Sequence, residues 1–258
     1  MPSLFFKEAG DGPPLVFLHG FCETHEIWDD FLRPLSEDFR VLLPDLPGFG
    51  KSEILPTPFT IDDVGDAVAK WLTEIKVSKA VVVGHSMGGY IALSMAAMHA
   101  NLLRGFCLFH STAFADTEEK KENRNRIIQF VSKNGVPPYI DTFVPGLFFD
   151  KSNPSIRAVH AIASQTKAAT LIAYAQAMRE RPDRSGELQK SDVPKILIVG
   201  VEDTVVPIQS SREMAKMAQN FSYLELENVG HMGIFEAKNE CQAATKRFAY
   251  KIFFNNWI

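Results

Sequence analysis

The stretch that decides the fold is VVVGHSMGG, residues 81–89. Its three consecutive valines, Val81–Val83, are typical of a fully buried strand. Gly84, Ser86 and Gly88 fit the pattern G-x-S-x-G, and the apolar residues that follow have the composition of a buried helix. A strand must therefore turn into a helix within about three residues. Such a turn is strained, and it raises the Ser86 hydroxyl at the carboxyl edge of a sheet.

Length, composition and charge limit the classes of protein. The chain has 258 residues, of which 46% are hydrophobic, so it can build one large domain with a sizeable core. The net charge is −4, and the basic pair Lys120-Lys121 lies among glutamates, so we expect no nucleic-acid partner. The three cysteines are scattered, without a disulfide framework or CxxC metal spacing, which favours a reducing compartment.

The sequence also carries a prediction about location. Residues 1–6 are too short for the apolar part of a signal peptide, and no run of about 18 apolar residues occurs. We therefore expect a cytoplasmic protein with no membrane partner. A homodimer stays open as a state of assembly.

Short apolar runs alternate with helical patterns along most of the chain. This alternation predicts an α/β protein with a mostly parallel, twisted sheet and helices on both faces. Strands are expected at residues 3–8, 15–18, 40–43, 81–83, 104–109, 195–201 and 221–227. Helices are expected at residues 27–35, 60–75, 90–99, 207–219 and 233–254, with Thr60 as an N-cap.

The alternation stops near Ser111 and resumes near Gly186. The sequence between them shows helical patterns and no strong strand, so it predicts a helical insertion at residues 112–186. The α/β core is then formed by residues 1–111 and 187–258. Helices of the insertion are expected at residues 117–133, 138–149, 154–165 and 168–181.

The Ser86 hydroxyl needs a general base, which is usually a histidine held by a carboxylate. His231 follows an expected strand and precedes a helix, and Asp203 follows another buried strand, so both reach the carboxyl edge of the sheet. Glu202 is the neighbour that competes with Asp203, and Asp116 is an alternative from the insertion. The backbone N–H groups of Met87 and Phe21 are expected to hold the oxyanion of a tetrahedral intermediate.

Five motifs in order resemble those of the α/β-hydrolase family. They are His19-Gly20-Phe21, Asp45–Ser52, Gly84–Gly89, Gly200–Asp203 and Gly230-His231. The chain is similar to the subgroup with a helical lid, which includes small carboxylesterases, enol-lactonases, haloperoxidase-like esterases and carbon–carbon bond hydrolases. The resemblance covers nearly the whole chain.

This resemblance implies further features. It makes the insertion at residues 112–186 a lid, inserted after the sixth strand. Because the chain begins close to its first strand, the family's outermost strand should be missing, which leaves about seven strands. The nucleophile is Ser86 and not an aspartate, which argues against epoxide hydrolase and haloalkane dehalogenase chemistry.

Several side chains are candidates for contacts with a substrate. His110 ends a strand near the site, and Tyr139, Phe143 and Tyr174 belong to the aromatic side chains of the insertion. An apolar lid would favour a hydrophobic acyl or aromatic group. Four arginines of the insertion could meet a substrate carboxylate, and the sequence does not select among Arg124, Arg126, Arg157 and Arg179.

The sequence thus predicts a serine hydrolase that cleaves a small ester, thioester or lactone through an acyl-Ser86 intermediate. His231 would carry the proton and Asp203 would orient His231, without a metal or organic cofactor. The same residues could instead serve a carbon–carbon bond hydrolase or a lyase. A ligand-binding protein that kept the fold without turnover is the third alternative.

Overall fold

The computed structural model describes residues 4–219 and 221–254, and within them seven strands form one sheet. The strand order is β1-β3-β2-β4-β5-β6-β7, with β1 antiparallel to β3 and the other neighbours parallel. The expected mostly parallel sheet of about seven strands is confirmed, although Ser3 lies outside the described residues. The strands are β1 Phe6–Ala9, β2 Pro14–Leu18, β3 Arg40–Pro44, β4 Ala80–His85, β5 Leu103–Phe109, β6 Lys195–Gly200 and β7 Phe221–Leu226.

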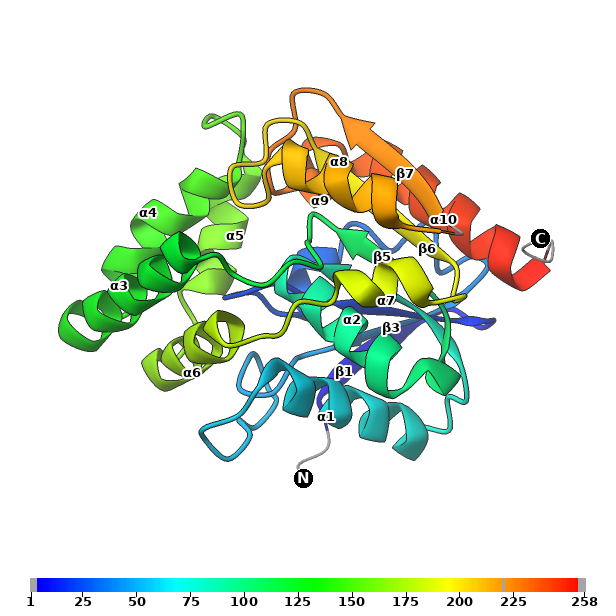
Figure 1. Ribbon diagram of the computed structural model, residues 1–258, viewed down its shortest axis with the longest axis horizontal. Helices are drawn as coiled ribbons and strands as arrows, with labels where there is room; N and C mark the ends of the chain where they lie inside the picture. Colours follow the sequence, from blue (N-terminus) through cyan, green and yellow to red (C-terminus); the bar gives the residue numbers. More distant parts are fainter. Residues whose placement is uncertain (1–3, 220, 255–258) are drawn as a thin grey trace.

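Helices cover both faces of the sheet, because successive strand residues point to opposite sides. Val82 of β4 packs into the hydrophobic cluster formed with α1, α2 and α8, whereas Val81 and Val83 pack into the cluster formed with η1 and α10. Figure 1 shows the sheet between these helices. The core helices are η1 His25–Trp28, α1 Ile61–Glu74, α2 Met87–Met98, η2 Ala100–Leu102, α8 Ile208–Met217, α9 Gly233–Glu236 and α10 Lys238–Phe254.

Two expected helices differ from those observed. The expected helix at residues 27–35 is a 3-10 helix, η1, followed by turns. Pro34 explains this difference, because proline lacks the backbone N–H and disfavours helical backbone at the residue before it. The helical spacing still predicts correctly which side chains are buried, since Phe31 and Leu35 are fully buried. The expected closing helix is divided into α9 and α10 at Ala237.

The helical insertion lies between β5 and β6 and gathers at one side of the sheet, at the left of Figure 1. It follows the fifth strand of this chain and not the sixth, because the expected number included an additional first strand that the described sheet lacks. The short helix α7, Ser185–Lys190, packs against α2 and α8 and so joins the core. The remaining helices are α3 Glu118–Asn134, α4 Pro137–Leu147, α5 Ser155–Ala163 and α6 Ala168–Arg179.

The insertion is anchored to the core through α6 and the loop that follows β3. The Tyr174 hydroxyl donates to the Pro47 carbonyl at 2.9 Å, and Thr170 Oγ1 donates to the Gly48 carbonyl at 3.1 Å. The Tyr174 ring also packs against Phe49, with ring centroids 4.8 Å apart. None of the helices in the described residues has the length and apolar character of a bilayer-spanning segment.

Candidate active site

Ser86 occupies the turn between β4 and α2, as the sequence predicts. Its φ of 50° and ψ of −113° are strained for a residue other than glycine. Neighbouring groups hold this conformation: the Ser86 N–H donates to the Phe109 carbonyl at 2.9 Å, and the Ser86 carbonyl accepts from the Ser111 hydroxyl at 2.7 Å. The strain is therefore supported by β5 and by the chain that leaves it.

Two glycines allow α2 to lie close to the strands. A Cβ atom at Gly84 would overlap the backbone of Gly88, and a Cβ atom at Gly88 would overlap the Leu18 carbonyl at the end of β2. Only glycine leaves room for this approach. As a result, the amino end of α2 stands directly behind Ser86, where the Met87 N–H belongs to the first turn and has no partner within the helix.

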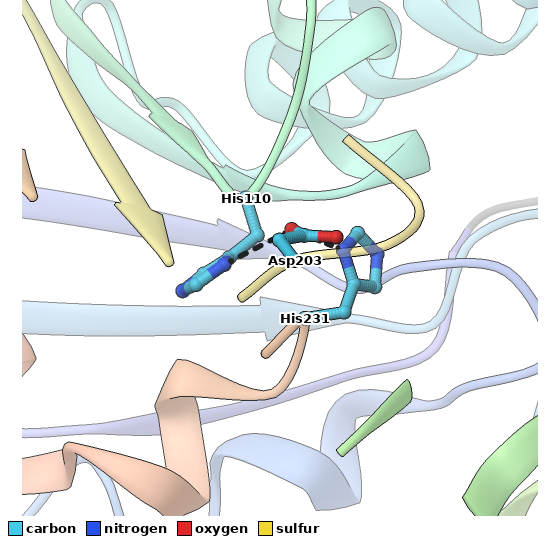
Figure 2. Close-up of side chains that lie close together, drawn as sticks. All are labelled: His110, Asp203 and His231. Carbon is cyan, nitrogen blue, oxygen red and sulfur yellow. Dashed lines mark hydrogen bonds and ion pairs between the residues drawn. The ribbon is translucent and has the colours of Figure 1, made fainter. Parts of the chain in front are cut away.

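Asp203 and His231 meet at the carboxyl edge of the sheet, although 28 residues separate them in sequence. The His231 Nδ1 lies 2.8 Å from Asp203 Oδ2, and both side chains are buried (Figure 2). The other oxygen, Asp203 Oδ1, accepts from the N–H groups of Val205 and Val206 at 2.8 and 2.9 Å. Burial opposes the charge of Asp203, but the neighbouring imidazoles of His231 and His110 keep its pKa below the ordinary value.

The competing carboxylates lie elsewhere. Glu202 is exposed to solvent, and Asp116 pairs with Arg124 at 3.1 Å and with Arg181 at 2.7 Å. Of the three acids considered from the sequence, Asp203 is the one that bonds His231.

Ser86 and His231 line one cavity. Within residues 4–219 and 221–254 the Ser86 hydroxyl forms no hydrogen bond. The observation that relates Ser86 to His231 is therefore that both residues line the same cavity. The walls combine apolar side chains with two charged ones, and Phe21 belongs to them. The complete lining is Phe21, Glu23, Ser86, Tyr90, Arg124, Phe143, Leu147, Met178, Val205 and His231.

Comparison with known proteins is consistent with this geometry. Residues 13–135 match a family model described as alpha/beta hydrolase fold. The solved structure of a thermophilic esterase from Thermogutta terrifontis has a TM-score of 0.91, with 28% sequence identity over 96% of this chain and 93% of that chain. The chain therefore has the α/β-hydrolase fold.

Relatives of this α/β hydrolase are themselves named as hydrolases. It is 24% identical to AB hydrolase superfamily protein YisY of Bacillus subtilis (strain 168), over 96% of this chain and 95% of that protein. It is 25% identical to 2-hydroxy-6-oxo-6-(2'-aminophenyl)hexa-2,4-dienoic acid hydrolase of Metapseudomonas resinovorans, over 94% of this chain and 86% of that protein. The chain is accordingly a hydrolase.

His110 of this α/β hydrolase is not a substrate contact, contrary to the expectation. It is fully buried, and its Nδ1 lies 3.3 Å from Asp203 Oδ2, on the side away from His231 (Figure 2). Burial lowers the pKa of His110 to about 4, so the side chain is neutral at neutral pH. The position of His110 in the sequence correctly predicts that it lies at the carboxyl edge of the sheet. The direction of its side chain depends on its backbone φ of 48°, which cannot be predicted from the sequence pattern.

The group of His110, Asp203 and His231 has the donor types of a metal site. Their donor atoms lie within 4.8 Å of one another. Hydrogen bonds already account for this closeness, because Asp203 Oδ2 accepts from both imidazoles. The group therefore fits a carboxylate that orients two rings.

The three aromatic candidates of the insertion have different surroundings. Phe143 lines the cavity, where it could contact a substrate. Tyr139 stacks on Phe143, with centroids 5.0 Å apart and planes at 17°, and is not part of the described lining. Tyr174 of α6 is fully buried against Phe49 and is not part of the described lining, so the expectation of a substrate contact is wrong for it.

Several lining residues were not expected from the sequence. Glu23 could have been found, because it follows β2 at the same edge as Phe21. The Arg124 guanidinium was one of four equal candidates, and only the packing of α3 brings it to the cavity. Tyr90, Leu147, Met178 and Val205 also line the cavity, and no signal distinguishes them from core residues.

Proposed function

We propose that this α/β hydrolase cleaves small carboxylic esters, thioesters or lactones with Ser86 as nucleophile. The observation that carries the proposal is the strained turn that presents Ser86 to the cavity that His231 also lines, with Asp203 on the far nitrogen of His231. A serine hydroxyl is a weak nucleophile until a base takes its proton. The arrangement supplies that base and the carboxylate that orients it.

The reaction follows from these positions. Ser86 Oγ attacks the carbonyl carbon as His231 Nε2 takes its proton, and Asp203 stabilises the imidazolium through Nδ1–H. The N–H groups of Met87 and Phe21 hold the oxyanion, each worth about 10²–10³ in turnover. His231 then protonates the leaving oxygen or sulfur. Water repeats the sequence on acyl-Ser86 and releases the acid.

The walls of the cavity support a small substrate with an apolar part. Phe143, Leu147 and Met178 from the insertion face the space that Ser86 enters, so we propose that the insertion acts as a lid. An apolar cover excludes water and strengthens hydrogen bonds to the oxyanion. Esterase chemistry agrees with the structural likeness to the esterase from Thermogutta terrifontis.

Replacement of Ser86 tests the assignment. Ser86→Ala should lower kcat/KM for 4-nitrophenyl butyrate by about 10⁴-fold or more, because the acyl-enzyme no longer forms. Ser132→Ala on the exposed face of α3 is the matched control and should keep wild-type activity. Near-full activity of Ser86→Ala, with correct folding shown by circular dichroism, would reject Ser86 as nucleophile.

A carbon–carbon bond hydrolase is the second candidate, and the relative from Metapseudomonas resinovorans favours it. The same Ser86 and His231 would then act on a ketone. Intact mass of the protein, quenched during turnover of an activated ester, separates the two. Accumulation of an acyl adduct favours the ester hydrolase, and ketone cleavage without ester turnover favours the second candidate.

A further inference from the structure

Arg124 brings a positive charge into the cavity that contains Ser86 and His231. The residue lies on α3 of the insertion, and its side chain is 17% exposed. The neighbouring walls include Phe143 and Met178, which offer no hydrogen bonds to a guanidinium. A charge in such surroundings is costly unless an opposite charge lies close to it.

The carboxylate of Asp116 forms ion pairs with two arginines, Arg124 and Arg181. Asp116 Oδ2 accepts from Arg124 Nε at 3.1 Å, and Asp116 Oδ1 pairs with Arg181 Nη1 at 2.7 Å. Arg181 is held firmly, because it also donates to the carbonyls of Met178 and Phe114 and lies 4.0 Å from the centre of the Tyr90 ring. These three side chains by themselves carry one net positive charge, and Asp183 also interacts electrostatically with Arg181.

Glu23, the acidic residue among those that line the cavity, does not balance the positive charge of Arg124. Glu23 Oε2 lies 2.9 Å from His85 Nδ1, and His85 Nε2 lies 3.1 Å from the His231 carbonyl. Both nitrogens of His85 face acceptors, so both carry hydrogen and the ring is an imidazolium. Burial works against this charge, but Glu23 raises the pKa of His85. Glu23 and His85 therefore neutralise each other.

The end of the Arg124 side chain remains available to a ligand. Its Nε bonds Asp116, while its two Nη groups have no hydrogen-bond partner among residues 4–219 and 221–254. Asp116 thereby fixes the direction of the guanidinium and leaves its outer edge free. That edge is the part of arginine that binds a carboxylate with two parallel hydrogen bonds.

We propose that the substrate of this site carries a carboxylate in addition to the scissile ester, thioester or lactone, and that Arg124 binds this carboxylate. Asp116 is a positioning residue for Arg124. The inference rests on the proposed function and names its substrate class. It also distinguishes Arg124 from the other arginines of the insertion: Arg126, two residues along the same helix, is 72% exposed and pairs with Glu122.

Matched esters test the proposal. Mono-4-nitrophenyl glutarate carries the carboxylate on the acyl side, and 4-nitrophenyl pentanoate is its neutral partner. 4-Acetoxybenzoate carries the carboxylate on the leaving group, and 4-acetoxybenzamide is its neutral partner. Wild-type protein should prefer the anionic member of at least one pair in kcat/KM, and the preferred pair shows on which side of the scissile bond Arg124 lies.

Variants of Arg124 give the second part of the test. Arg124→Gln should lower the anionic-to-neutral ratio of kcat/KM about 10–100-fold, since a hydrogen bond to a charged group is lost. Arg124→Lys should restore part of the ratio, because it keeps the charge without the fork. Arg126→Gln is the matched control and should keep the wild-type ratio. Glutarate should inhibit pentanoate ester hydrolysis competitively in wild type, with a Ki that rises in Arg124→Gln.

Failure of this proposal is distinct from failure of the proposed function. If wild type prefers both neutral esters and glutarate does not inhibit, the carboxylate proposal is wrong while Ser86 keeps its role. The same conclusion follows if Arg124→Gln and Arg126→Gln change the ratio equally. If Arg124→Gln does not fold, Arg124→Lys and the inhibition of wild type by glutarate still decide. Loss of every esterase activity together with an unreactive Ser86 would instead reject the proposed function.

Discussion

At the scale of single residues, one carboxylate orients two histidines of different character. Asp203 Oδ2 contacts His231 at 2.8 Å and His110 at 3.3 Å. His231 faces the cavity, whereas His110 is enclosed and its pKa is lowered to about 4 by burial. A histidine whose pKa is lower in the folded protein than in the unfolded chain makes stability fall as the pH falls between the two values.

His110 therefore predicts a measurable dependence of stability on pH. In the unfolded chain its pKa is near 6.5, so between pH 6.5 and 4 the unfolded chain binds the additional proton. Lowering the pH from 8 to 5 should cost wild type about 2 kcal/mol more than His110→Asn, at 1.36 kcal/mol per pH unit over about 1.5 units. Asparagine suits the left-handed backbone of this position. Urea unfolding of both proteins at the two pH values measures the difference, and equal losses would contradict the assignment.

At the scale of elements, the strand–turn–helix around Ser86 is decided by local sequence. Three valines, the spacing of Gly84, Ser86 and Gly88, and the apolar helix after them all lie within about 20 residues, so the turn could be predicted. The structure explains why position 88 is a glycine: a Cβ atom there would overlap the Leu18 carbonyl at the end of β2. That contact joins segments about 70 residues apart and has no local signal.

The approach of α2 to β2 predicts the effect of one methyl group. Gly88→Ala should lower the free energy of unfolding by about 1–3 kcal/mol, because the new Cβ meets backbone that must shift. Gly146→Ala is the control: it lies in α4 with nothing within 4 Å of the added Cβ, so it should be neutral or stabilising by at most about 1 kcal/mol. Denaturant unfolding compares the two, and equal effects would show that the close approach does not limit position 88.

At the scale of the whole molecule, the sequence predicts the sheet and the edge of the site better than its walls. Ser86, Asp203 and His231 each follow a strand of the parallel part of the sheet, so their position at one edge of the sheet follows from topology. The walls depend on how the insertion packs onto distant loops. Tyr174 contacts Pro47 and Phe49 and does not line the cavity, whereas Arg124 does. Both placements result from the packing of the insertion.

The most direct test of the central claim is the reaction of the folded protein with a fluorophosphonate, followed by peptide mapping by mass spectrometry. The account predicts one phosphonyl adduct, on Ser86, whose formation slows by more than about a hundredfold in His231→Ala because the general base is missing. An unmodified Ser86 in folded wild-type protein, or an adduct formed at another serine, would contradict the account and favour a ligand-binding protein without turnover.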